Sequence, residues 1–239
     1  MQQPDFLGQL LDLQKLSDAA HAHKALFVVS AYPTAMGLIK PPGDFGADIV
    51  VGEGQPLGMA LSFGGPYVGI FTCRNEYIRQ LPGRIVGKAL DKEGKQAYVL
   101  TLRTREQDIR RERATSNICT NEGLIALIVT IYLSAMGKQG LRQVAEQSYH
   151  KAHYAAAEIA KLPGYELAFD GPFFNEFVVR CKPAEAVEAV QKACREAGII
   201  GGYSLSEVFD DMADCLLFCC TEMNTREEID RLVAVLKAV

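Results

Sequence analysis

Hydrophobic and polar positions alternate between helical and strand spacing along the first part of the chain. Apolar residues recur at helical spacing over 10–24, and the short apolar run over 25–30 is typical of a buried strand. Because helices and strands alternate, this part is predicted to contain α/β units with a parallel sheet. The further patterns predict strands at 47–52, 67–72 and 97–102, a short helix at 75–81 and a polar hairpin or loop at 88–96.

A long helical pattern then separates two parts of the chain. It runs from Asn121 to Gly137, and a second helix is predicted over 139–161. Such a helix pair is typical of a connection between a large domain and a smaller one. We therefore expect one domain over 1–145, including these connecting helices, and a small α/β domain over 146–239.

The last part repeats a compact α/β pattern. Asn224, followed three residues later by Glu227, predicts a capping box at the start of a final helix, because such a pair satisfies free backbone N–H groups. Ahead of it, the patterns predict strands at 165–169, 175–181 and 215–221 and a helix at 183–197.

The composition is that of a globular protein, since 49% of its 239 residues are hydrophobic. A net charge of −4 and a pI near 5.6 give no electrostatic footprint for nucleic acid or for an anionic membrane. No stretch approaches the ~18 consecutive apolar residues of a membrane span, and the N-terminus lacks a signal-peptide pattern. A cytoplasmic protein that binds small molecules and other proteins is expected.

The seven cysteines indicate neither a disulfide framework nor a zinc knuckle, because no pair has C-x-x-C spacing. Cys215, Cys219 and Cys220 form a cluster, but the apolar residues between them predict a buried strand. Positions four apart on a strand are separated by ~13 Å, too far to share a metal ion. Core thiols are therefore expected at these positions.

Two pairs of histidines are candidate metal sites. His150 and His153 can share a helix face, but no acidic residue completes a metal site, so a solvent-facing pair is expected. His21 and His23 are two apart and point to different sides of a helix. We expect no metal site at either pair.

Four segments together carry a resemblance to a known family. They are GADIVVG at 46–52, FGGP at 63–66, LPGRIVG at 81–87, and a stretch over 104–120 that begins TREQ and ends ATSNICT. The chain resembles the P-protein of the glycine cleavage system, in its subunit 1 form of glycine dehydrogenase (decarboxylating). The resemblance covers essentially the whole chain. Members of this family have a long N-terminal region that includes the first half of the large domain. That region has no counterpart here, so the chain resembles a C-terminal fragment of such a protein.

The resemblance implies the fold of the fold type I pyridoxal-phosphate (PLP) enzymes, with part of the large domain and a small C-terminal α/β domain. In that family the cofactor is bound by a lysine, which in the sister subunit lies just beyond the strand corresponding to 47–52. Here Gln55 and Pro56 occupy that stretch, and no lysine occurs over 41–74. Lys40 precedes the strand and would project from the wrong end. No covalent cofactor site is expected in this chain.

The resemblance further implies a heterotetramer in which subunit 2 binds PLP and this type of chain is its pseudo-symmetric partner. Glycine would be decarboxylated and its aminomethyl group passed to the lipoyl group of the H-protein. The chain alone is expected to be inactive, and self-association through its exposed sheet face is a hypothesis. Two alternatives stay open: a degenerate scaffold or interaction protein of the same fold, and an independent PLP enzyme with an unusual lysine.

The first group of candidate pocket or interface residues follows the strand at 47–52. Gln55 can donate hydrogen bonds to a ligand, or it is an ordinary loop residue. Gly64 and Gly65 can let the backbone approach the partner's cofactor phosphate, or they form a tight turn before a strand. The sequence leaves both alternatives open.

The second group lies in the arginine-rich stretch over 104–121. One interpretation is a subunit interface or an approach to the active site, since arginine pairs with carboxylate or phosphate in a forked geometry. The other is a solvated helix start with local ion pairs. The resemblance favours the first, for Arg105, Arg110, Arg111 and Asn117. The aromatic run at 173–177 is interpreted as an edge of the small-domain core rather than as a channel wall.

Overall fold

A four-stranded sheet organises the N-terminal part of the computed structural model, which describes residues 1–103, 106–114 and 122–239. β1, β2 and β3 run parallel, and β4 pairs antiparallel with β3. The predicted parallel sheet is thus wrong at β4, because the connection from β3 to β4 contains no helix, the usual element of a parallel crossover. The sheet order is β1 (Gln2–Gln3), β2 (Val28–Ala31), β3 (Ile49–Glu53) and β4 (Gly69–Cys73).

α1 (Leu13–Ala22) packs against this sheet. Asp12 caps the helix, since its carboxylate accepts a hydrogen bond from the backbone N–H of Lys15 at 3.2 Å. Leu13 is buried in one cluster with Phe27, which precedes β2. The helix predicted over 10–24 and the strand predicted after it are confirmed with shorter bounds.

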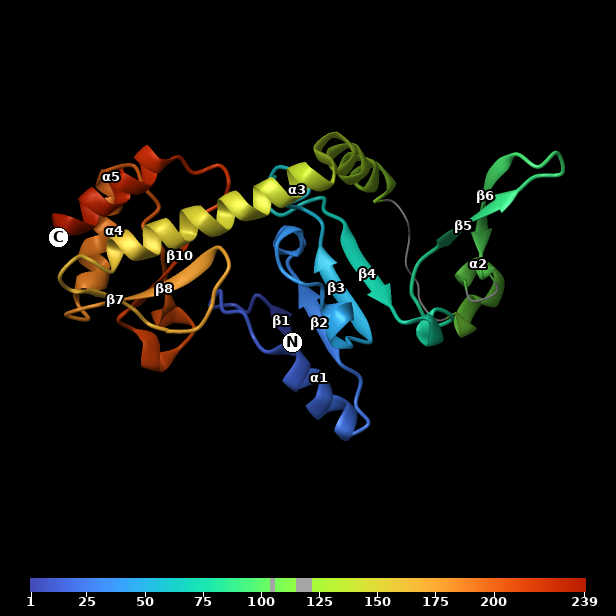
Figure 1. Cartoon of the computed structure of the whole chain (residues 1–239), viewed down its shortest axis with the longest axis horizontal. Coiled ribbons are helices and arrows are strands. Elements are labelled where there is room, and N and C mark those ends of the chain that lie inside the picture. The colour runs from blue at the N-terminus through green and yellow to red at the C-terminus, as the bar shows by residue number, and fades with distance from the viewer. Residues whose placement is uncertain (104–105, 115–121) are drawn as a thin grey trace.

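A β-hairpin of β5 (Ile85–Leu90) and β6 (Gln96–Thr101) follows the first sheet. This confirms the strand predicted at 97–102 and the hairpin alternative for 88–96. The short helix predicted over 75–81 is a 3-10 turn at Asn75–Tyr77. In Figure 1 the hairpin extends away from both larger sheets, with α2 (Gln107–Arg110) near its base.

α3 (Gly123–Ile159) is a long helix broken at Gly137, where φ is 63° and ψ is −176°. The two helices predicted to meet at this glycine are therefore confirmed. By length and composition alone α3 is apolar enough to cross a membrane, since one stretch of 18 residues within it has a mean hydropathy of 1.5. After the break, however, it buries an alanine-rich face that ends in Ile159 against the second sheet. We interpret its exposed apolar side before the break as a packing surface.

The second sheet is antiparallel throughout, in the order β7-β8-β10-β9. One face is covered by the second half of α3 and by two further helices, as Figure 1 shows. The predicted boundary near residue 145 falls inside α3 and stays a prediction. The elements are β7 (Tyr165–Leu167), β8 (Glu176–Cys181), α4 (Ala186–Glu196), β9 (Tyr203–Ser204), β10 (Cys215–Cys219) and α5 (Arg226–Lys237).

The cap of α5 lies one residue later than predicted. Thr225 is the N-cap: its hydroxyl accepts from the backbone N–H of Glu228 at 3.2 Å, and the Glu228 carboxylate accepts from the Thr225 N–H at 2.8 Å. The Asn224 side chain instead accepts from the Thr221 N–H at 2.8 Å. The pairs Asn224/Glu227 and Thr225/Glu228 both fit the capping pattern. The Asn224 side chain is used in the turn at Thr221, so Thr225 caps the helix.

Two expectations about packing need correction. His153 is not solvent-facing, because its ring stacks on Phe173 with centroids 3.9 Å apart and its Nδ1 lies 2.9 Å from the Tyr149 carbonyl oxygen. Burial lowers the pKa of His153. Cys215 and Cys220 are buried thiols as expected, whereas Cys219 is exposed. The core interpretation of the aromatic run at 173–177 is confirmed, since Phe173, Phe174 and Phe177 are all buried.

Candidate functional site

The carboxyl ends of β2 and β3 lie at one edge of the first sheet, because these strands are parallel neighbours. In open α/β sheets, ligands bind at this edge. Tyr32 directly follows β2, and the loop 54–68 directly follows β3. This edge holds Gln55, Gly64 and Gly65 and is the natural place to look for a site.

The loop 54–68 is closed by polar contacts at its base. The Glu53 carboxylate accepts from the backbone N–H groups of Gln55 and Val68, each at 3.1 Å. The Gln55 side chain donates to the Met59 carbonyl oxygen at 2.7 Å. Its amide N–H is thus used to hold the loop, which accords with the ordinary-loop alternative for this residue.

The glycines of this loop have two different roles. A Cβ at Gly58 would lie 2.7 Å from the Cβ of Tyr132 on α3, so this glycine permits close packing. Gly64 and Gly65 have φ of 107° and 150°, which favours glycine. A Cβ at Gly64 would meet nothing within 4 Å, and neighbouring Phe63 is 110% exposed. The loop tip is therefore shaped by backbone conformation and stands open within the described chain.

The residues after β3 do not fit a covalent PLP site. Pro56 carries no amine, and the Gln55 side chain is engaged with the loop backbone. The Lys40 ammonium lies over the Phe45 ring, 4.5 Å from its centroid, before the start of β3. No amine of this loop can bond an aldehyde carbon, because the sequence contains none over 41–74.

α2, the described helix of the arginine-rich stretch, lies near the base of the β5–β6 hairpin and away from β3 (Figure 1). Arg105 and Asn117 fall outside the described residues. Arg110 closes α2 and Arg111 follows it with a φ of 51°, and both are exposed. Local ion pairs stabilise the segment: Arg103 to Asp108 at 2.5 Å and Arg84 to Glu106 at 3.3 Å. Among the described residues, no hydrogen bond or ion pair joins Arg110 or Arg111 to the loop 54–68.

A polar cluster between the two sheets was not predicted from the sequence. Glu176 and Cys219 lie directly opposite each other on β8 and β10. The Asn175 amide donates to the Cys219 sulfur at 3.3 Å, and Tyr32 contacts Phe174 with ring centroids 6.2 Å apart. The only sequence clue was the position of Tyr32 and Cys219 at strand ends. Three separate segments had to meet before a cluster existed.

The titratable groups of this cluster are a phenol, a thiol and a carboxyl group, none of which carries a positive charge. Burial raises the pKa of Tyr32 and outweighs a hydrogen bond with Thr34 that lowers it, and the nearby Cys219, Glu222 and Glu176 add to the rise. Although Cys219 is exposed as a residue, the surrounding protein desolvates its thiol, and this desolvation and the Glu176 carboxylate raise the pKa of the thiol to about 12. Burial and Asp5 raise the pKa of Glu176. The phenol and thiol keep their protons at neutral pH, so the cluster is suited to hydrogen bonding and not to nucleophilic attack.

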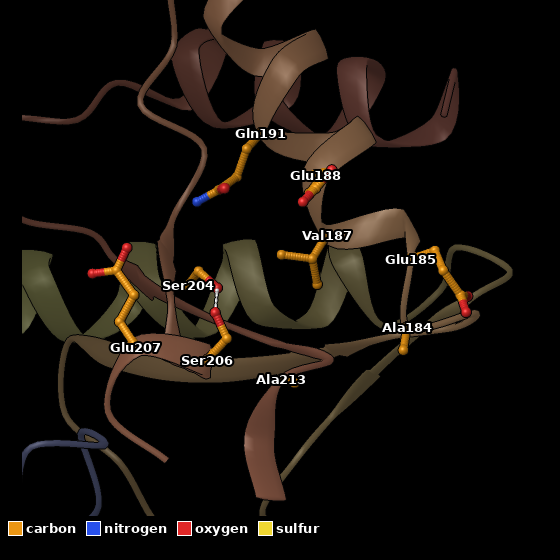
Figure 2. A pocket seen from close by; sticks show the side chains of 9 residues that line it. All are labelled: Ala184, Glu185, Val187, Glu188, Gln191, Ser204, Ser206, Glu207 and Ala213. Carbon is orange, nitrogen blue, oxygen red and sulfur yellow. Dashed lines mark hydrogen bonds between the residues drawn. The ribbon is translucent and has the colours of Figure 1, made fainter. Parts of the chain in front are cut away.

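Figure 2 shows an open pocket of about 500 Å³ in the small domain, between the start of α4 and the segment after β9. Glu185, Glu188 and Glu207 present carboxylates around it, and the hydroxyls of Ser204 and Ser206 lie 2.9 Å apart. All three carboxylates belong to exposed residues. In the described part of the chain, no group of three histidine, cysteine or acidic residues is arranged to hold a metal ion. The pocket is an acidic surface feature without an assigned ligand.

Solved structures resemble this arrangement across the chain. A crystal structure of glycine decarboxylase (P-protein) of the glycine cleavage system, in inhibitor-bound form, matches with a TM-score of 0.89 and 43% identity. The match covers 100% of this chain and 54% of that chain. Sphingosine-1-phosphate lyase of Burkholderia pseudomallei matches in fold alone, with a TM-score of 0.66, 15% identity and coverage of 97% of this chain and 49% of that chain. The α/β fold is that of the PLP-dependent transferases.

Sequence comparison is more specific. Residues 1–236 match the family described as glycine cleavage system P-protein, and the chain belongs to that family. Probable glycine dehydrogenase (decarboxylating) subunit 1 of Thermomicrobium roseum is 55% identical, over 99% of this chain and 52% of its own length. The corresponding Desulfitobacterium hafniense protein is 52% identical, over 98% of this chain and 52% of its own length. The chain spans about half the length of these relatives.

Proposed function

We propose that this chain is the C-terminal half of a subunit of glycine dehydrogenase (decarboxylating) that does not bind PLP covalently. A second subunit type, subunit 2, holds the cofactor, and the assembly acts in the cytoplasm. The reaction is the decarboxylation of glycine with transfer of the aminomethyl group to the lipoyl group of the H-protein. The observation that carries the proposal is the stretch after β3, where Gln55 and Pro56 supply no amine. The name shared by the relatives, subunit 1, supports a partner subunit.

The described residues support a positioning role for this subunit. The loop 54–68 is tied at its base by Glu53 and packs on α3 at Gly58, so its base is held in place while its tip at Gly64 stays open. Tyr32 and Cys219 retain their protons at neutral pH because their pKa values are raised by burial and by the neighbouring carboxylates. We assign them no catalytic step.

An exchange assay between glycine and labelled bicarbonate tests the proposal. Full-length subunit 1, subunit 2 and their mixture are each assayed with H-protein and PLP. Exchange only in the mixture is expected, because one subunit supplies the cofactor lysine and the other completes the assembly. Exchange by subunit 1 alone would overturn the lysine argument.

A scaffold without an enzyme role is the second candidate, favoured only by the lack of an amine near Pro56. It predicts full exchange by subunit 2 alone and no increase on adding subunit 1. An independent PLP enzyme with an unusual lysine predicts an absorbance that borohydride removes while labelling one lysine of this chain. These readouts separate the three functions with one set of proteins.

A further inference from the structure

The residues between β1 and α1 form a loop that leaves the first sheet and returns to it. We term this loop, residues 4–11, the strap. Its neck is closed by Gln3, whose side-chain oxygen accepts a hydrogen bond from the backbone N–H of Leu11 at 3.1 Å. Gln3 is only 6% exposed and pairs with Ala31 of β2. Both ends of the strap are therefore fixed to the first sheet, since α1 begins at Leu13 and packs there.

The tip of the strap is held in shape by one side chain. The Asp5 carboxylate accepts hydrogen bonds from the backbone N–H groups of Leu7 and Gln9, each at 2.9 Å. The Gly8 N–H donates to the Asp5 carbonyl oxygen at 3.0 Å. An aspartate that binds the backbone a few residues ahead fixes a turn. The tip thus has a defined shape before it contacts anything else.

The backbone of the strap pairs with the segment 172–174, which leads into β8. The Gly8 carbonyl oxygen accepts a hydrogen bond from a backbone N–H of this segment at 3.2 Å, and the Leu10 N–H donates to one of its carbonyl oxygens at 2.8 Å. Gln9, between them, forms an antiparallel bridge with the same segment. Figure 1 shows the start of the chain, in blue, reaching from the first sheet toward β8. The strap therefore connects the two sheets.

Gly8 makes the closest contact of the strap with the second sheet. Its φ is 82°, which favours glycine, and a Cβ there would lie 1.9 Å from the carbonyl oxygen of Glu176, the first residue of β8. No larger residue fits at this position without moving the strap. Leu7 adds apolar packing, because it lies against a buried cluster of the second sheet formed by Val178, Leu205, Met212 and Cys215.

A buried apolar cluster continues this contact beside the strap. Ala35, Ala145 and Phe174 form it, and they come from the segment after β2, from α3 and from the approach to β8. Leu10 of the strap packs against this cluster. Close by, a Cβ at Gly37 would lie 2.7 Å from a carbonyl oxygen in the second half of α3. The two sheets are thus joined by tight packing as well as by the strap.

Two structural units joined by a limited interface are expected to move relative to one another. The break of α3 at Gly137 is a natural hinge, because the half before it contacts the β3 loop and the half after it packs on the second sheet. We propose that the strap locks the two sheets into one rigid body, so that this hinge does not open.

A locked seam has a consequence for the polar cluster of Tyr32, Glu176 and Cys219, which lies between the two sheets. Its geometry stays constant when ligands or partners bind, because the strap and the second sheet move together. Any closing motion of a larger assembly must then occur outside this chain. The inference concerns contacts within the described residues and goes beyond the proposed function.

Pulsed electron–electron resonance measures the distance between the two parts in a polypeptide of the relatives' full length. Spin labels are attached to ketone-bearing amino acids at exposed Ala22 of α1 and exposed Ala189 of α4, which leaves the native cysteines unlabelled. One narrow distance distribution is expected, because the strap holds the sheets at one separation. It should stay unchanged when subunit 2, PLP and glycine are added.

Two variants loosen the strap by different routes. Gly8→Ala introduces the clash with β8, and Gln3→Ala removes the side-chain contacts that close the neck. Each is expected to broaden the distance distribution or to add a longer distance. Gly198→Ala is the matched control, since its φ of 71° carries a similar conformational cost while its Cβ would meet nothing within 4 Å in the described chain. It should keep the narrow distribution.

Broadening by Gln3→Ala, with Gly198→Ala unchanged, supports the strap as the lock. Gln3→Ala decides the question if Gly8→Ala does not fold, because it removes side-chain contacts without adding a clash. A narrow distribution for every folded strap variant overturns the proposal, and so does equal broadening by Gly198→Ala. A wild-type distance that shifts on adding glycine or subunit 2 also overturns it. Absence of glycine–bicarbonate exchange in the wild-type mixture rejects the proposed function and leaves the strap result standing.

Discussion

At the scale of single residues, Asp48 ties α1 to the first sheet. It is 3% exposed and accepts hydrogen bonds from the Phe27 N–H and from His21, each at 2.8 Å. The Arg74 guanidinium lies 3.3 Å from its other oxygen. His21, which forms no metal site, therefore has a structural role that the spacing of two histidines did not indicate.

Asp48→Asn is expected to lower the free energy of unfolding by about 2 kcal/mol, since it removes a buried charge from three partners. The loss is moderated because the His21 and Arg74 side chains are 37% and 44% exposed. Urea unfolding at pH 7 measures it, with exposed Asp44→Asn as the control. Equal stability of the two variants would contradict the structural role.

Wild type and Asp48→Asn together also test how the contribution of Asp48 to stability depends on pH. Burial raises the pKa of Asp48, but the hydrogen bonds from His21 and Phe27 and the charge of Arg74 outweigh it and hold the pKa below its usual value. A lowered pKa in the folded state stabilises the protein above the unfolded pKa of about 3.9, and that contribution is lost as pH falls through the folded value. The stability difference between wild type and Asp48→Asn should shrink as the pH falls from 6 toward about 3.

At the scale of elements, Gly137 sets the direction of α3. Its φ of 63° favours glycine, and a Cβ there would meet nothing within 4 Å, so the cost of a side chain is purely conformational. Gly137→Ala is expected to destabilise by about 1–2 kcal/mol or to straighten the helix. Gly123→Ala, also without neighbours within 4 Å but at the helix start, should be neutral or stabilising. Thermal unfolding of Gly137→Ala and Gly123→Ala measures the two stability changes.

The cap of α5 is a second element-scale feature. Thr225→Ala removes the hydroxyl that accepts from Glu228 N–H, and should cost about 1 kcal/mol. Thr225→Ser keeps the hydroxyl and should lose at most a few tenths of that. Chemical unfolding curves compare the two. If Thr225→Ser lost as much unfolding free energy as Thr225→Ala, the packing of the Thr225 methyl group, and not the hydroxyl cap, would be the stabilising contact.

At the scale of the whole molecule, much apolar surface is uncovered. The first half of α3 exposes Leu124, Leu127 and Ile131 at 69%, 52% and 59%. An apolar hollow of about 370 Å³ opens on β2, β3 and β4, lined in part by Ala31 and Val51. We expect the rest of a polypeptide of the relatives' length to cover these surfaces.

The chain on its own should therefore self-associate, because water-exposed patches of this kind drive contacts between copies. Sedimentation velocity over a broad concentration range should give a boundary that moves faster at higher concentration. A polypeptide of the relatives' full length, without subunit 2, should show a weaker dependence, since the remainder of the polypeptide is expected to cover α3. A concentration-independent monomer of the isolated chain would contradict this expectation.

Local pattern predicted most elements, because side-chain period reports which face of a helix or strand is buried. The break at Gly137 and the strand of Cys215 were both predicted in this way. The reversed direction of β4 was not, since strand direction depends on how the connecting loop packs. The cap at Thr225 was displaced by one residue because two overlapping pairs fit the same motif.

The sequence by itself determined the family and the absence of a lysine over 41–74, because residue identity does not depend on how the chain folds. It also determined most helix and strand positions through their periodicity. Only the tertiary structure brought Tyr32, Glu176 and Cys219 together, and only it placed α2 away from β3. The physical reason is that exposure, pKa and contact depend on segments distant in the chain, whose packing no local pattern encodes.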